Sequence, residues 1–153
     1  MLALQWWIVG GIVTAIGLVL LFFWWKLYQI TRISESIAKQ DFETAKMQMA
    51  SIKNPQKLND YSKTYYFFFQ GVIDTHENKF KEAESALKQA LEVNKFRAPD
   101  DKASAHVMLG QLLFRKRNRV GGTRHLKEAR SLSDNPQIVT QVKELAKQMR
   151  IRI

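Results

Sequence analysis

The chain has 153 residues, no cysteine, and 24 Lys and Arg against 14 Asp and Glu. The lack of cysteine excludes a disulfide framework, a thiolate metal site and a cysteine nucleophile. The positive charge is uneven, because residues 26–94 carry 10 basic and 9 acidic side chains whereas residues 95–153 carry 14 and 5. A basic half fits an acidic protein surface, anionic lipid or RNA as a partner, and it equally fits a solvated face that keeps a domain soluble.

The first expected element is a transmembrane helix from Trp6 to Trp25. This stretch has no charged residue and carries a Trp pair at each end, where indole rings favour the headgroup zone. From Trp6 to Trp24 a helix rises about 27 Å, close to the ~30 Å hydrocarbon core of a bilayer. A cleaved signal peptide is disfavoured, because no Lys or Arg precedes Trp6 and the apolar run is too long. We therefore expect residues 1–25 to be an uncleaved single-pass anchor.

The flanks of this segment predict its orientation. Lys26, Arg32 and Lys39 follow the span, and the positive-inside rule then places the C-terminal domain in the cytoplasm. The compactness of the chain and the direct junction between the anchor and the helices that follow favour a bacterial inner membrane. The apolar periodicity also continues past Trp25, through positions 27, 30, 33 and 37, with no Gly or Pro before residue 40. The same helix should therefore run to about Lys39.

Small residues inside the span fall on one helix face, at Gly10, Thr14 and Gly17. Such faces let membrane helices approach closely. This face is a candidate for packing against another membrane protein or a second copy of the chain, and ordinary glycine use in a membrane helix is the alternative.

The rest of the chain, positions 26–153, predicts an all-α domain, since no segment alternates as a strand does. Pro and Gly residues mark the turns, and Asn135 is expected to cap a last helix that has Pro136 at its first position. Longer loops are expected at 54–60 and 95–101. The expected helices cover residues 42–53, 56–75, 80–94, 99–116, about 121–132 and 136–150.

These helices form pairs that recur along the chain at a nearly constant interval, from Phe42 to Phe80 and from Gly71 to Gly110. The clearest pair, about 64–94, resembles a tetratricopeptide repeat. The matching residues are a bulky residue, a small residue at the helix crossing, an aromatic after the turn, two close-packing alanines and a closing L-x-V-N: Phe67, Gly71, Phe80, Ala83, Ala90, Leu91, Val93 and Asn94.

The resemblance covers most of residues 27–135. A second unit, about 103–134, departs from the family pattern at His106, where a bulky apolar residue is usual, and at Gly122, where alanine is usual. A weaker unit, about 27–54, would use the continuation of the membrane helix as its first helix. The helix at 136–150 would be the solvating cap that such arrays need.

The resemblance implies a groove that binds other proteins, lined by the first helix of each pair. Carried onto this chain, the groove positions are Tyr65, Phe68, Val72, Thr75, Ser104, Val107, Gln111, Phe114 and Arg115. The alternative is that Phe68, Val107 and Phe114 are simply core residues.

The densest basic run is Arg115, Lys116, Arg117 and Arg119. We expect either contact with lipid phosphate or an acidic partner, or a solvated turn between helices. RNA is not expected, because no stacking aromatics interleave with these cations.

Nothing in the sequence favours an enzyme or a bound cofactor, since the three histidines at 76, 106 and 125 lie in no known motif. The sequence thus predicts a membrane-anchored adaptor that binds partner proteins and helps to assemble a membrane complex. The alternatives are an accessory subunit of a secretion, motility or respiratory machine, bound through its membrane helix, and a receptor for targeting sequences.

Overall fold

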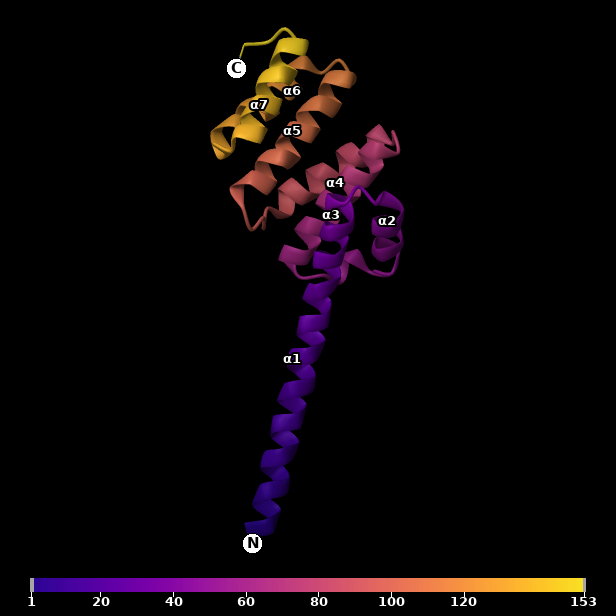
Figure 1. Ribbon diagram of the computed structural model, residues 1–153, viewed down its shortest axis with the longest axis vertical. Helices are drawn as coiled ribbons and strands as arrows, with labels where there is room; N and C mark the ends of the chain where they lie inside the picture. The colour runs from indigo at the N-terminus through magenta and orange to yellow at the C-terminus, as the bar shows by residue number, and fades with distance from the viewer. Residues whose placement is uncertain (1, 153) are drawn as a thin grey trace. The chain divides into compact units, whose positions relative to one another are not determined.

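The computed structural model describes residues 2–152 and, within the first helix, the side chains of residues 13–21, 24, 28 and 30–38. This part of the chain contains helices and no strand, so the expected all-α class is confirmed (Figure 1). It divides into two compact units, Met1–Gln48 and Met49–Ile153. In order, the helices are α1 (Leu2–Ala38), α2 (Phe42–Ala50), the 3₁₀ helix η1 (Pro55–Lys57), α3 (Asp60–His76), α4 (Phe80–Val93), α5 (Pro99–Arg115), α6 (Arg119–Leu132) and α7 (Pro136–Gln148).

Helix α1 is continuous over 37 residues, which confirms that the N-terminal helix does not stop at Trp25. Its surroundings change along its length: residues such as Leu18 and Leu21 are more than 60% exposed, whereas Ile30 and Ile33 are buried. After the turn that ends α1, the Asp41 carboxylate accepts a hydrogen bond from the Thr44 amide at 3.0 Å, so Asp41 caps α2.

Among the side chains that the structure describes, no helix presents an apolar stretch long enough to cross a membrane. Half of the side chains of the predicted span from Trp6 to Trp25 lie outside the described set, and so does Gly10 of the predicted packing face.

The second unit is built from two helical hairpins, α3–α4 and α5–α6, followed by α7, which packs on both α5 and α6. The two hairpins have the same dimensions, because every helix boundary of the second follows its counterpart in the first at one constant offset, from Asp60 to Pro99 and from Val93 to Leu132. Gly71 and Gly110 are separated by the same offset. The interval that these glycines indicate in the sequence is therefore the repeat of the structure in this part of the chain.

One turn geometry ends α1, α3, α5 and α7. The residues just after these helices, Gln40, Asn78, Arg117 and Arg150, have φ between 51° and 62°. In each turn the next amide donates to the carbonyl five residues earlier, for example from Lys79 to Asp74 at 2.8 Å, and the left-handed residue donates to the carbonyl three residues earlier. This is the Schellman ending of a helix, and after α1, α3 and α5 it turns the chain toward the next helix.

Glycines allow the paired helices to approach closely. A Cβ added to Gly71 would lie 2.6 Å from Leu87 Cγ, and one added to Gly110 would lie 3.1 Å from Leu126 Cγ. Gly122 is tighter still, with Phe114 Cδ2 at 2.3 Å and the Gly110 carbonyl oxygen at 3.0 Å. The Phe114 ring therefore leaves no room for the alanine that the proposed resemblance would place at position 122.

Asparagine side chains cap the N-termini of three of the helices. Asn59, Asn118 and Asn135 accept hydrogen bonds from the amides of Ser62, Gly121 and Gln137, respectively. The prediction of Asn135 as a cap with Pro136 at the first position is confirmed. Two of the expected helices differ from the structure. The helix expected over 42–53 ends at Ala50. Residues 56–75 are not a single helix, because η1 ends at Lys57 and Asn59 caps a new helix.

Candidate functional site

The predicted groove residues lie on α3 and α5, and the structure separates them into buried and accessible sets. Tyr65 and Val107 are buried, at 7% and 1% exposure, and the other seven are partly or fully exposed. A surface that reaches a partner can therefore include Val72, Thr75 and Gln111 but gains nothing from Tyr65 or Val107.

The Tyr65 hydroxyl forms hydrogen bonds within the domain. It donates to Asp101 Oδ2 at 2.5 Å and accepts from the Arg97 amide at 3.0 Å. Burial, and then the hydrogen bond to the Asp101 carboxylate, raise the pKa of Tyr65 to about 12. Next to it, Thr64 Oγ1 accepts from the Lys95 amide at 3.1 Å. These bonds fix the loop between α4 and α5 against α3.

Three apolar groove candidates pack inside the unit. Val107 belongs to a core cluster with Leu126, Ile138 and Val142, and Phe114 packs against the same cluster. Phe68 packs against the cluster around Leu87 and Leu109, and its ring meets Phe96 of the α4–α5 loop with ring centroids 6.0 Å apart. These placements agree with the alternative that all three are core residues.

The basic run 115–119 forms the turn between α5 and α6. Arg115 lies over the Phe80 ring, with its Cζ 4.7 Å from the centroid, and Lys116 pairs with Glu84 at 2.7 Å. Arg119 donates to the Met149 carbonyl at 2.8 Å. Arg117 is the left-handed residue of the turn. Three of the four cations therefore have contacts within the chain, and all four remain exposed.

Glu84 links the first hairpin to this turn. It is buried on α4, and it accepts from Lys88 at 2.6 Å and from Lys116 at 2.7 Å. The hydrogen bond from Lys116, followed by that from Lys88, lowers the pKa of Glu84. Lys116 thus helps to connect the two hairpins.

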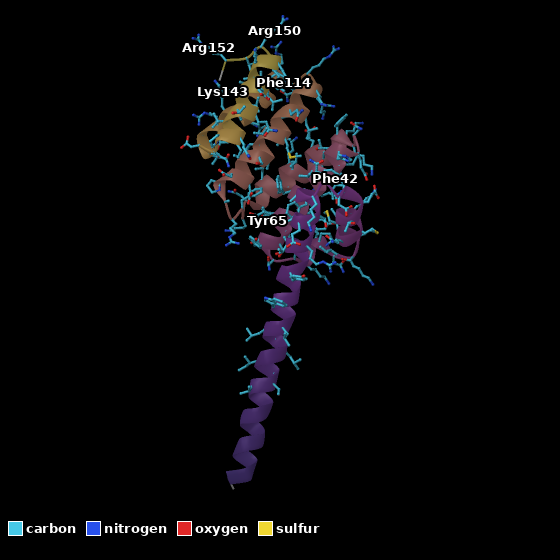
Figure 2. The ribbon with its side chains drawn as sticks, in the orientation of Figure 1. Phe42, Tyr65, Phe114, Lys143, Arg150 and Arg152 are labelled. Atoms are coloured by element: carbon cyan, nitrogen blue, oxygen red, sulfur yellow. The ribbon has the colours of Figure 1, made fainter. Side chains whose placement is uncertain are left out.

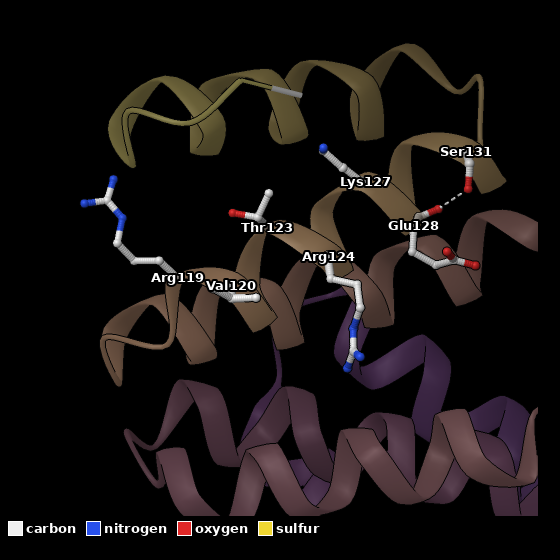
Figure 3. A pocket seen from close by; sticks show the side chains of 7 residues that line it. All are labelled: Arg119, Val120, Thr123, Arg124, Lys127, Glu128 and Ser131. Atoms are coloured by element: carbon white, nitrogen blue, oxygen red, sulfur yellow. Dashed lines mark hydrogen bonds between the residues drawn. The ribbon is translucent and has the colours of Figure 1, made fainter.

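A second basic surface, which the sequence does not single out, follows the outer face of α6 (Figure 3). It is an open groove of about 680 Å³. Val120 lies in this groove and is 84% exposed. The lining contains three basic side chains and one acidic side chain. The lining residues are Arg119, Val120, Thr123, Arg124, Lys127, Glu128 and Ser131.

The structure also brings two histidines together that the sequence does not predict to be neighbours. His106 of α5 and His125 of α6 are 19 residues apart, and their Nδ1 atoms lie 2.8 Å apart, so one ring donates and the other accepts. Burial, together with His125 and the nearby cations Lys102 and Arg124, lowers the pKa of His106 to about 4. Burial and Arg124 also lower the pKa of His125. Both imidazoles are therefore neutral near pH 7.

Within the described residues, no cluster of three or more His, Cys, Asp or Glu side chains could hold a metal ion. Comparison with protein-family models, with curated proteins and with solved structures finds no match to this chain.

Proposed function

We propose that this chain is a membrane-anchored adaptor of the tetratricopeptide type, which binds partner proteins without catalysis and helps to assemble a membrane complex. The observation that carries the proposal is the repeated hairpin: α3–α4 and α5–α6 match at one constant offset, and the turn that ends their first helices recurs at Gln40. Repeated hairpins that stack into a continuous core are typical of proteins that bind other proteins.

The membrane part of the proposal is supported by α1. The apolar side chains of α1 from Val13 to Leu21 are mostly exposed, and no other part of the described chain covers them. A long exposed apolar surface of this kind is typical of a membrane or protein contact. The uncharged sequence between the two Trp pairs supplies the length that a bilayer requires. The basic residues that follow favour a cytoplasmic position for the helical domain.

Once the buried and core-packed groove candidates are excluded, the groove positions that remain on α3 and α5 are mainly polar with one apolar residue. Val72 and Thr75 of α3 and Ser104, Gln111 and Arg115 of α5 are accessible, and we propose that they contact the partner. Ser104 and Thr75 also donate to carbonyls one turn earlier, at 2.9 and 2.7 Å, so their hydroxyls are already oriented.

A second candidate function is that of an accessory subunit held through α1. A Cβ added to Gly17 would meet no atom within 4 Å, so this position of the helix is open to a neighbouring helix. Gly17→Leu should then release the chain from its complex while it stays in the membrane.

The two candidates are separated by gentle detergent extraction followed by quantitative identification of the co-purifying proteins. We expect Val72→Arg and Gln111→Arg to remove the partners recovered with the wild-type chain, because each puts a bulky charge on the proposed surface. Lys81→Gln, at an exposed position of α4, serves as the matched control. If Gly17→Leu alone removes them, the accessory-subunit function is correct, and if all variants recover the same proteins, both proposals fail.

A further inference from the structure

The C-terminal helix has a cationic cavity that the repeat pattern does not explain. It has a volume of about 310 Å³ and lies between α6, α7 and the residues that follow α7. Its walls carry four cations, and none of the described residues that line it is acidic. These cations are Arg130, Lys143, Lys147 and Arg152. Figure 2 shows Lys143 and Arg152 on the same side of this part of the chain.

The position of Lys143 shows what kind of surface this is. Counted from the shared turn residue, Lys143 lies seven residues before Arg150, as Gly71 lies before Asn78 and Gly110 before Arg117. Both glycines are buried against the second helix of their hairpin. On α7 the same position is an exposed lysine. This face of α7 therefore corresponds to a helix-packing face but is built for ionic contact instead of close packing.

The side chains on α7 form two parallel rows. Lys143 and Lys147 are four residues apart and share one side of the helix. Val142 and Ala146 form the adjacent row, but both are buried, at 1% and 8% exposure, so they close the bottom of the cavity without reaching a partner. Ile151 adds a further apolar wall. Among the described residues, Asp134 is the one carboxylate that pairs with a wall residue, 3.2 Å from Arg130. It is fully exposed, so solvent screens this pair.

We propose that this cavity is a docking site for an acidic helical segment of a partner protein, with carboxylates four residues apart beside an apolar row. Charge complementarity selects this occupant, because the four cations match such a row of carboxylates and the partly exposed Ile151 lies beside them. The inference rests on the proposed adaptor function, and it adds a site that is distinct from the accessible residues of α3 and α5.

The test uses the full chain in a nonionic detergent and a short fluorescein-labelled peptide. The peptide is helical, with Glu at four-residue spacing beside a Leu row, and a scrambled peptide of the same composition is the comparison. Binding is measured by fluorescence anisotropy at one fixed ionic strength. We expect the double variant Lys143→Glu, Lys147→Glu to weaken binding about tenfold or more.

The control is a double variant of the same net charge, Lys81→Glu with Lys95→Glu, at exposed positions outside the cavity. It should bind the peptide as the wild-type chain does, with circular dichroism showing that both variants are folded. Equal losses in the two double variants would mean that only net charge matters, and equal binding of the scrambled peptide would exclude a helical partner.

Vesicles of phosphatidylcholine with and without phosphatidylglycerol form the last arm of the experiment. If they bind with the same dependence on Lys143 and Lys147 while the peptide does not, the cavity binds lipid and the proposal is wrong. A failure in these assays leaves the adaptor function standing, because co-purification through Val72 and Gln111 tests that function separately.

Discussion

At the scale of single residues, Gly122 and Phe114 depend on each other. Phe114 occupies the space that the side chain of an alanine at 122 would need, and the Gly110 carbonyl closes the other side. The helix backbone at Gly122 has no positive φ, so the requirement for glycine is steric. The departure from the repeat pattern is therefore a compensation for a large ring on the facing helix.

Gly122→Ala should lower the free energy of unfolding by about 1–2 kcal/mol, because the strain of overpacking exceeds the gain in helix propensity. Thermal unfolding of the detergent-solubilised chain, followed by circular dichroism, measures the change. In a chain that also carries Phe114→Leu, adding Gly122→Ala should cost less than it does in the wild-type chain. An equal cost in both backgrounds would show that the two residues are not coupled.

The pair of His106 and His125 makes stability depend on pH. His106 has a pKa of about 4 in the folded chain against an ordinary value of 6.5, so between these values the unfolded chain binds more protons. The contribution of neutral His106 to the free energy of unfolding should be fully present above about pH 6.5. As the pH decreases toward 4, the free energy of unfolding should fall by on the order of 2 kcal/mol because of this group.

Melting temperatures at pH 7.5 and pH 5 check this expectation. His106→Gln should reduce the difference between the two temperatures, because the glutamine side chain keeps a polar contact without titrating. If His106→Gln melts with the pH dependence of the wild-type chain, other groups are responsible.

At the scale of the elements, local signals predicted the helices well where they were complete. Asn135 with Pro136 supplies both a cap and a first position, and α7 begins there as expected. The expected helix over 56–75 combined two elements, because apolar periodicity does not show where a short 3₁₀ helix stops and Asn59 caps the next helix. Capping chemistry at Asn59 was the signal that could have separated them.

For α1, a charge near the middle of the proposed span distinguishes a membrane helix from a water-exposed one. Ile16→Arg puts a guanidinium among exposed apolar residues, at a cost of about 2.5–3.5 kcal/mol for insertion. The fraction of chain that resists alkaline carbonate extraction should fall about tenfold or more. Tyr28→Arg, beyond the span, is the matched control and should remain in the membrane. A wild-type chain that carbonate releases would contradict the anchor.

At the scale of the whole molecule, the sequence predicted the helical class and the interval between the two hairpins, because both can be recognised from local patterns. It could not predict which groove positions are accessible, because that depends on distant contacts. Tyr65 forms hydrogen bonds with Arg97 and Asp101, which lie beyond α4 in the sequence. Val107 is covered by residues of α7. The histidine pair was missed for the same reason, since only the crossing of α5 and α6 brings the rings together.

The constant offset between the two hairpins has a consequence for how this chain can change in length. One residue inserted into α4 or α5 turns every later side chain of that helix by about 100° and moves its apolar residues off the core. Duplication of a whole hairpin with its loop leaves each helix facing the same kind of neighbour. The hairpin region can therefore grow or shrink only in whole units, and gradual lengthening is confined to its loops.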